Sequence, residues 1–523
     1  MRKIRSPLGE NIFPSERHRY LHNQTPRPFA CSPRRRPPSS STMCQPLPMS
    51  ENEGRLGNQE PLSVWNQSAP RVYICVVLCF PCDSQLQGDA ARHIELSLKR
   101  LARERPVFAG RLRASSNGGV SLHRSPLLEI PFQVLTTDEA SEQDYERMRD
   151  EGFPPSIFVH PRFGVSGSIS PGLDSVPVSK VQAVFPKGGL MLSIFLHHGL
   201  VDGGSLRVFL ECFAAQTRRT LVDLPSEQAF PMLDSRNCRN PAHIHSVSAF
   251  RGLMARCPEF TMLPDLSGPT QPRLLKTGMA MRHIEKTGKI FVFSHERLQE
   301  LRELIRSRNH TSEPPTAYTS LAALAFAHIT KSRVAAEKYL PGVRPRPVAT
   351  LWNSVNWRTR AFQDAAAKYF GNAALPAVTE ASITQLAAAC DDDEKLAQLV
   401  PLVKQSIDAV NEEYVSRRLA MLSEAPDPRL VGVNYDPRMP EVLAFNTWRH
   451  FGADIEWSIP GVPVARADAI RRAHGCWNLG TALILPAKAD SMKQELFVSL
   501  SIDAMKLLCA DGGWMKWVDR VIG

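Results

Sequence analysis

The chain has 523 residues, 43% of them hydrophobic, which is enough for two or three domains with large cores. Its net charge of +11 is concentrated at one end: residues 1–48 contain nine Lys and Arg against two Glu, so +7 belongs to this segment and +4 to the other 475 residues. The basic balance therefore gives no reason to expect nucleic-acid binding by the folded part, and the lack of any run of 18 apolar residues argues against a transmembrane helix.

The N-terminal segment and the cysteines indicate an intracellular protein with a disordered start. Residues 1–55 are basic and interrupted by prolines, so we expect a disordered tail. The eleven cysteines follow no framework spacing, which favours reduced thiols and a cytoplasmic location. Cys79 and Cys82 are separated by two residues, but no second pair completes a zinc site, so no metal is expected.

Hydrophobic periodicity predicts alternating strands and helices in both halves of the chain. The first half is predicted to contain a strand at 71–80, a helix at 89–104, a hairpin turn at 115–119, a hairpin formed by 181–185 and 189–196, and a helix at 204–217. The second half is predicted to contain strands at 289–293, 347–352, 442–448 and 495–502, and helices at 296–306, 316–333, 394–420 and 503–508.

The composition between these halves predicts a domain boundary. Residues 222–275 are rich in Pro, Ser and Asn and are interpreted as a crossover linker. We therefore expect an α/β protein with an N-terminal domain at 56–221 and a C-terminal domain of similar size at 276–523.

The most informative motif is His-His-Gly-Leu-Val-Asp-Gly at residues 197–203. It follows the apolar run 191–196, so both histidines come at the end of a buried strand, where a side chain can reach a cleft from a rigid scaffold. Imidazole has a pKa near 6.5 and can act as a general base at neutral pH. These seven residues fit a purely structural histidine equally well, so the choice between a structural and a catalytic role depends on other segments of the chain.

His-His-x-x-x-Asp-Gly resembles the signature of the CoA-dependent BAHD acyltransferases, especially the fungal branch that includes trichothecene 3-O-acetyltransferase-like enzymes. Further segments resemble this family's motifs in the same order along roughly residues 61–517: Pro61-Leu-Ser63, Ala109–Leu112, Tyr318–Arg333, Val355–Arg360, Tyr369–Ala373 and Asp454–Trp457. The sequence departs from the family pattern at Asn66, where aspartate is common, and at Ile455, Glu456 and Ser458.

The resemblance implies two chloramphenicol-acetyltransferase-like domains, each a mixed sheet flanked by helices, with the active site in the channel between them. It implies acyl-CoA, with acetyl-CoA as the expected donor, as a co-substrate, and no permanently bound cofactor. His198 matches the family's general base, which removes the acceptor proton and returns it to the leaving CoA sulfur. His197 is expected to pack or hydrogen-bond behind it, because adjacent side chains on a strand point to opposite faces.

Asp202 has two possible roles. It could orient the imidazole of His198, as in a catalytic triad. The family instead implies that Asp202 turns away and pairs with an arginine, which together with Gly203 holds the loop in shape. Arg358 is the candidate partner, and Arg360 is the second choice.

Other family motifs give weaker assignments. Thr447 and Trp448 could donate hydrogen bonds to the oxyanion or line the channel, although Trp448 could equally be a core aromatic residue. Asp454 and Trp457 belong to a motif that is expected to be structural. Gly371-Asn372 is expected to form a tight turn that makes no contact with the site.

The expected function is transfer of an acyl group from acyl-CoA to a hydroxyl of a secondary metabolite, in a ternary complex, by a monomeric enzyme. One alternative is a condensation-like domain that uses carrier-protein thioesters, against which Tyr-Phe-Gly-Asn-Ala argues. The other is a non-catalytic binding protein of the same fold; the intact His198 and Asp202 argue against it, while the altered Asp454 motif keeps it open.

Overall fold

The computed structural model describes the chain in nine stretches: residues 59–114, 119–124, 129–135, 144–169, 175–220, 247–262, 284–337, 346–362 and 369–523. The chain divides into two units, Met1–Arg55 and Leu56–Gly523, and the fold described here is that of the second. The expected disordered tail, residues 1–55, lies outside the described residues.

The first half is built on a five-stranded sheet in the order β15-β2-β8-β7-β5. Its centre is the antiparallel pair β2 (Tyr73–Pro81) and β8 (Gly189–His197), aligned from Tyr73 opposite His197 to Pro81 opposite Gly189. Helices α2 (Gln87–Glu104) and α5 (Gly203–Arg218) contribute to the hydrophobic cluster on one face, while α4 (Tyr145–Asp150) packs in the cluster on the other. Because both faces are covered, every residue of β8 is buried.

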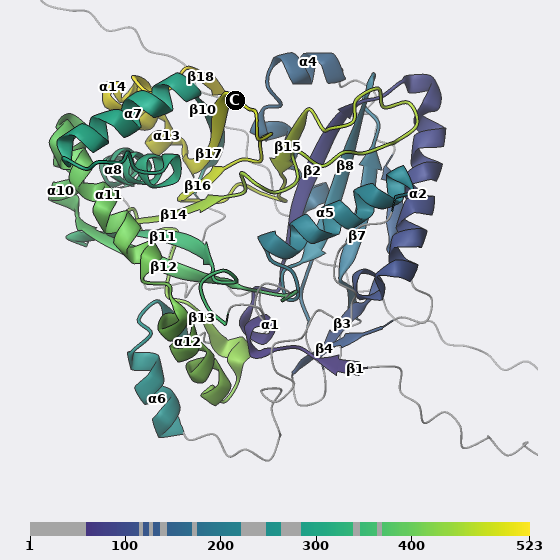
Figure 1. Ribbon diagram of the computed structural model, residues 1–523, viewed down its shortest axis with the longest axis horizontal. Helices are drawn as coiled ribbons and strands as arrows, with labels where there is room; N and C mark the ends of the chain where they lie inside the picture. Colours follow the sequence, from purple (N-terminus) through teal and green to yellow (C-terminus); the bar gives the residue numbers. More distant parts are fainter. Residues whose placement is uncertain are drawn as a thin grey trace, which may run out of the picture. The chain divides into compact units, whose positions relative to one another are not determined.

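The second half is built on a seven-stranded mixed sheet in the order β12-β11-β14-β16-β17-β10-β18 (Figure 1). The strands are β10 (Lys286–Ser294), β11 (Val348–Asn356), β12 (Ala374–Ser382), β14 (Val442–Thr447), β16 (Thr481–Ile484), β17 (Lys493–Ser501) and β18 (Arg520–Ile522). The helices that share its main core are α7 (His295–Arg308), α8 (Ala317–Glu337), α10 (Ile383–Asp391), α11 (Asp393–Asp408), α13 (Ile502–Ala510) and α14 (Gly512–Met515).

One strand crosses from the second half into the first. β15 (Ala469–Arg472) pairs antiparallel with β2, so a segment from late in the chain forms an edge of the first sheet (Figure 1). Its Arg471 lies 2.9 Å from Glu495 of β17 in a buried ion pair, which ties the two sheets together. The crossing matters for the site, because it brings late residues to the sheet that ends at His198.

The segment expected to be a linker contains structure of its own. Within residues 222–275, the described part forms α6 (Val247–Ala255) and β9 (Phe260–Met262), and β9 pairs with β13 (Val431–Val433). Phe250 and Cys257 are buried in a cluster that also contains residues of α12 (Glu412–Glu424). This piece of the crossover therefore packs against the second half.

Most of the predicted elements on described residues are present, with one clear error; residues 115–118 of the predicted hairpin turn at 115–119 lie outside the described residues. The helix predicted over 394–420 is two helices, α11 and α12, because Asn411 between them caps the second by accepting a hydrogen bond from the Tyr414 N–H at 2.9 Å. No described helix is long and apolar enough to cross a membrane.

Candidate active site

His197 is the last residue of β8, and both nitrogens of its ring form hydrogen bonds with the backbone. Its Nε2 lies 2.8 Å from the carbonyl oxygen of Gly167, and its Nδ1 accepts the N–H of Gly199 at 3.0 Å. Burial lowers the pKa of His197 to about 3, so the ring is neutral at any ordinary pH. His197 therefore shapes the turn that follows the strand, as expected, and has no ring nitrogen left for a substrate.

His198 follows directly and lies on the opposite side, at a pocket. Its Nδ1 is 3.0 Å from the Oδ1 of Asn372. The orientation of this amide is fixed, because Asn372 Nδ2 donates to the carbonyl oxygen of His198 at 2.8 Å and to Asn66 Oδ1 at 2.9 Å. His198 Nδ1 must therefore carry the proton, which leaves Nε2 with a free lone pair.

The expectation that Gly371-Asn372 makes no contact with the site is wrong. Asn372 holds the imidazole of His198 by a side-chain contact that no spacing in the sequence reveals, since the two residues are 174 positions apart. Asn66 supports it from the other side: its Oδ1 accepts both the backbone N–H and the side-chain N–H of Asn372 at 2.9 Å. Burial lowers the pKa of His198, so the base is neutral at pH 7.

Asp202 turns away from His198 and forms a two-pronged ion pair with Arg358. The two contacts are 2.8 and 3.0 Å long, and both side chains are at least 90% buried. Asp202 also accepts the N–H groups of Ser205, at the start of α5, and of Ala373, each at 2.9 Å. Burial would raise the pKa of the Asp202 carboxyl, but Arg358 and these hydrogen bonds outweigh it and hold the pKa below its usual value.

Asp202 therefore pairs with Arg358, and among the described residues it makes no hydrogen bond to His198 of the kind that a catalytic triad requires. Arg360, the second choice, instead lies 3.9 Å from Asp408 and donates to the carbonyl oxygen of Ile407. Gly203 starts α5 where a Cβ atom would come within 2.2 Å of the Phe451 ring. The loop after His198 is thus clamped by an ion pair and by close packing.

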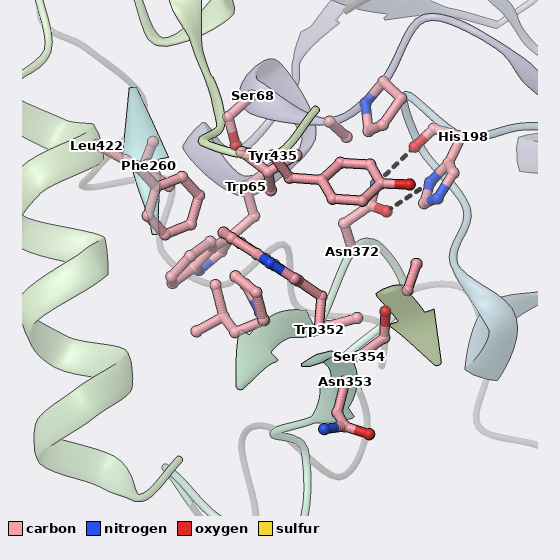
Figure 2. Close-up of a pocket in the computed structure, with 17 residues that line it drawn as sticks. Trp65, Ser68, His198, Phe260, Trp352, Asn353, Ser354, Asn372, Leu422 and Tyr435 are labelled. Atoms are coloured by element: carbon pink, nitrogen blue, oxygen red, sulfur yellow. Dashed lines mark hydrogen bonds between the residues drawn. The ribbon is translucent and has the colours of Figure 1, made fainter. Parts of the chain in front are cut away.

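The pocket beside His198 has a volume of about 280 Å³ and lies between the two halves. In Figure 2, His198 and Asn372 lie at one end of the pocket, and the aromatic side chains of Trp352, Phe260 and Trp65 line the part that leads away from them. The ring of Tyr435 is directed toward His198. The remaining residues of the wall come from both halves: Ser68, Ala69, Pro70, Asn353, Ser354, Ala374, Leu375, Pro376, Leu422, Val433 and Ala444. The wall is mostly apolar, which suits an apolar substrate.

The predicted oxyanion donors lie elsewhere in the described part of the chain. Neither Thr447 nor Trp448 is among the residues that line this pocket. The Thr447 hydroxyl accepts the N–H of Arg449 at 3.2 Å, and the Trp448 ring packs against Phe451 with 6.1 Å between ring centroids. Their role at the oxyanion stays a prediction without support from the geometry.

The second family motif lies in structural surroundings. Asp454 accepts the backbone N–H of Ala489 at 3.0 Å on the exposed surface. Trp457 is 97% buried and makes edge-on contacts with Phe80 and Phe213 of the first half. These residues anchor a late segment of the chain to the first domain.

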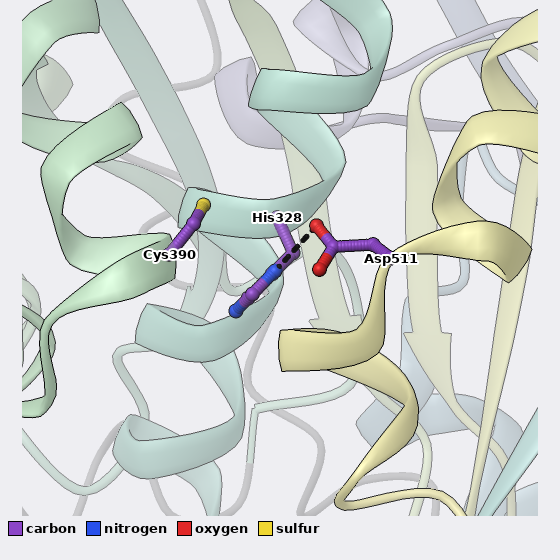
Figure 3. A group of neighbouring side chains, drawn as sticks. All are labelled: His328, Cys390 and Asp511. Carbon is purple, nitrogen blue, oxygen red and sulfur yellow. Dashed lines mark hydrogen bonds and ion pairs between the residues drawn. The ribbon is translucent and has the colours of Figure 1, made fainter.

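A separate group of possible metal ligands lies among the helices of the second half. His328 of α8, Cys390 of α10 and Asp511, which caps α14, have ligand atoms within 4.8 Å of one another (Figure 3). Each already has a partner: His328 Nδ1 is 2.9 Å from Asp511 Oδ2, Asp511 Oδ1 accepts the N–H of Gly513, and the Cys390 thiol donates to Leu386. The group holds three helices together through protein contacts.

Known proteins match this chain over most of its length. The profile of the Transferase family matches residues 167–512, and that of the trichothecene 3-O-acetyltransferase-like N-terminal domain matches residues 72–215. Trichothecene 8-O-acetyltransferase of Fusarium sporotrichioides is 23% identical, with 71% of this chain and 78% of the relative covered. Eremophilane O-acetyltransferase ORF8 of Penicillium roqueforti is also 23% identical, with 88% and 98% covered.

Solved structures share the fold. Fusarium graminearum TRI101 complexed with coenzyme A and deoxynivalenol matches with a TM-score of 0.70 at 18% identity, covering 89% of this chain and all of that one. Vinorine synthase matches with a TM-score of 0.56 at 17% identity, covering 91% and 96%. The predicted α/β fold of two acyltransferase domains is therefore confirmed.

Proposed function

The chain belongs to the Transferase family of BAHD-type acyltransferases, and from this premise we propose that it transfers an acyl group from acyl-CoA to a hydroxyl group of a small secondary metabolite. The observation that carries the proposal is the state of His198: it lines a pocket, is neutral, and has its proton held on Nδ1 by Asn372. Its Nε2 makes no hydrogen bond to a described residue, so its lone pair is available to accept a proton as a general base.

In the proposed reaction, Nε2 of His198 accepts the proton of the acceptor hydroxyl as its oxygen bonds to the thioester carbonyl carbon. The tetrahedral intermediate then collapses, the carbon–sulfur bond breaks, and the imidazolium returns the proton to the CoA sulfur. The products are the ester and free CoA, and the histidine is regenerated. A base placed in this way accelerates a reaction by about 10²–10⁴-fold.

We assign Asp202, Arg358 and Asn372 to positioning. Asn372 fixes the tautomer of His198, and the Asp202–Arg358 pair fixes the segment that carries Asn372, because Arg358 also donates to the carbonyl oxygens of Tyr369 and Gly371 at 2.9 and 2.6 Å. Asp202 receives the N–H of Ala373 from the same segment. The histidine and its holder thus come from different halves of one chain, which is consistent with action as a monomer.

The acceptor is proposed to be a largely apolar alcohol and the acyl group acetyl. The aromatic wall of Trp65, Trp352 and Phe260 would bury an apolar ring system. The relatives are named for acetyl transfer to trichothecenes and to eremophilanes, which supports a terpenoid-like acceptor.

The test is acetyl-CoA turnover with a panel of fungal terpenoid alcohols, followed by mass spectrometry of the ester. His198→Ala should lower kcat by at least about 10²-fold, since the base is removed. His295→Ala, at an exposed histidine of α7, is the matched control and should leave turnover unchanged. A His198→Ala protein that is folded and keeps more than about a tenth of the wild-type kcat would contradict the assignment.

A further inference from the structure

Arg472 is a cation on the same face of the first sheet as the base. It ends β15 directly opposite Val76 of β2, which in turn is opposite Ile194 of β8. Residues directly opposite each other share a face, and so do alternate residues along a strand, so Ile194 leads by steps of two to His198. The side chain of Arg472 therefore starts on the face from which His198 reaches its pocket.

Arg472 has no anionic partner among the described residues, unlike the arginine beside it. Arg471 points to the other face, where it pairs with Glu495 and donates to the carbonyl oxygen of Gly152 at 2.9 Å. The Arg472 guanidinium instead lies over the ring of Trp448, 5.6 Å from the centroid. Arg472 is half-buried, and withdrawing a cation from water without an anion to pair it is costly, which makes it a candidate for a functional group.

The electrostatics agree with this location. Burial lowers the pKa of Arg472 to about 10, so it stays charged at neutral pH. Its charge helps to lower the pKa values of His198 and His474, and it is felt at Tyr435, whose side chain lines the pocket. The carboxylate of Asp202 in the loop after His198 is already neutralised by Arg358.

We propose that Arg472 forms an anion site facing His198 and takes a negatively charged oxygen of the reacting complex. This inference rests on the proposed acyl transfer, in which the thioester carbonyl oxygen becomes negative as the acceptor adds. The charge that develops there lies beside the base, and a preorganised donor in a water-poor site stabilises it strongly. The phosphates of CoA lie at the far end of the pantetheine arm from the thioester, so they are not the anion meant here.

The same site could also receive a carboxylate carried by the acceptor, and the two sources are distinguished by leaving the acceptor out. With acetyl-CoA and water alone, release of CoA thiol passes through the oxyanion but involves no acceptor carboxylate. Arg472→Met should then lower kcat by about 10²-fold with the KM for acetyl-CoA changed little, and Arg472→Lys should keep part of the activity. Calorimetry of benzoate binding tests whether the site accepts a carboxylate, and this measurement does not depend on turnover.

The controls separate this inference from the proposed function. Arg466→Met removes an arginine whose side chain is 39% exposed and should change neither measurement. The acid limb of the pH profile should move to higher pH in Arg472→Met, because a cation that disfavours protonation of His198 has been removed. A variant that is only destabilised would instead have a lower melting temperature than the wild type.

The outcomes are decisive in each arm. Lost thiol release in Arg472→Met assigns the anion to the reacting carbonyl, and weakened benzoate binding with normal thiol release assigns it to an acceptor carboxylate. Thiol release and benzoate affinity that both equal those of wild type overturn the anion site. Equal thiol release by wild type and His198→Ala would instead overturn the proposed function, whatever Arg472 does.

Discussion

Asp202 and Arg358 form an ion pair with two contacts, 2.8 and 3.0 Å long, that joins the loop after β8 to the segment after β11. The pair is buried, and Arg358 also donates hydrogen bonds to four other oxygens: Tyr369 O, Gly371 O, Ser205 Oγ and Asn356 Oδ1. Removing one member of such a pair leaves the other charge uncompensated, while removing both is far less harmful.

Asp202→Asn should therefore lower the free energy of unfolding by about 3–5 kcal/mol and reduce activity along with it. Asp202→Asn/Arg358→Met should recover part of this loss, because residues in one network are not additive. Urea denaturation of the single and double variants measures both effects, with Arg360→Met at the more exposed neighbouring arginine as the control. Strict additivity would mean that Asp202 and Arg358 do not interact. Full stability of Asp202→Asn with activity lost by about 10⁴-fold would instead point to a triad-like role in orienting His198.

Asn372 should control the tautomer of His198. In Asn372→Ala, Nδ1 loses its acceptor, the proton can move to Nε2, and kcat should fall by at least about tenfold, toward the ~10⁴-fold cost known for a wrong tautomer. In Asn372→Asp, a carboxylate beside Nδ1 favours the imidazolium, so the acid limb of kcat/KM should move to higher pH.

The pH–rate profiles of both variants are the measurement, with Asn434→Ala, at an exposed asparagine that donates to Pro258, as the control. An unchanged acid limb in a folded Asn372→Asp protein would mean that this side chain does not contact the base in solution.

Gly203 should tolerate no side chain. Its φ is unexceptional, so the obstacle is space: a Cβ atom would lie 2.2 Å from two ring carbons of Phe451. Gly203→Ala should lower the melting temperature by several degrees, and Gly203→Ala/Phe451→Leu should recover part of it. Gly252, in α6, has open space around the same position and is the control. Equal melting temperatures for Gly203→Ala and wild type would show that α5 can shift freely.

The sequence predicted those parts of the fold that depend on local pattern. β2, β8, α2 and α5 follow from continuous apolar runs and helical periodicity, and they deliver His198 as expected. β12 was missed because its short residues and Pro376 do not look like a strand; Pro is tolerated there because β12 lies at the edge of its sheet.

The sequence predicts only those residues of the site that belong to recognisable motifs. Asp202 and Arg358 were paired through the family resemblance, although they are 156 positions apart. The sequence does not reveal the role of Asn372, because Asn372 contacts His198, which is 174 positions away. It does not reveal the place of Arg472 either, because β15, which carries it, pairs with β2 in the sheet of the first half. Contacts of this kind depend on strand order, which hydrophobic periodicity does not reveal.

His197 should make the protein sensitive to mild acid. Its folded pKa of about 3 is below the value of about 6.5 expected in the unfolded chain, so the unfolded state binds more protons between these limits. The stability is complete above about pH 6.5 and falls as the pH drops toward 3, by up to about 1.4 kcal/mol per pH unit for this one histidine. His198, His328 and His474 also have lowered pKa values and add to the slope.

His197→Gln keeps a donor for the carbonyl oxygen of Gly167 and removes the titration, so its unfolding free energy should depend less steeply on pH between 5 and 7 than that of wild type. His295→Gln, at the exposed histidine of α7, should keep the wild-type slope. Urea denaturation at half-unit pH intervals gives both slopes. Identical slopes for His197→Gln and wild type would mean that His197 is not held neutral, and the turn that presents His198 would then have to be organised in another way.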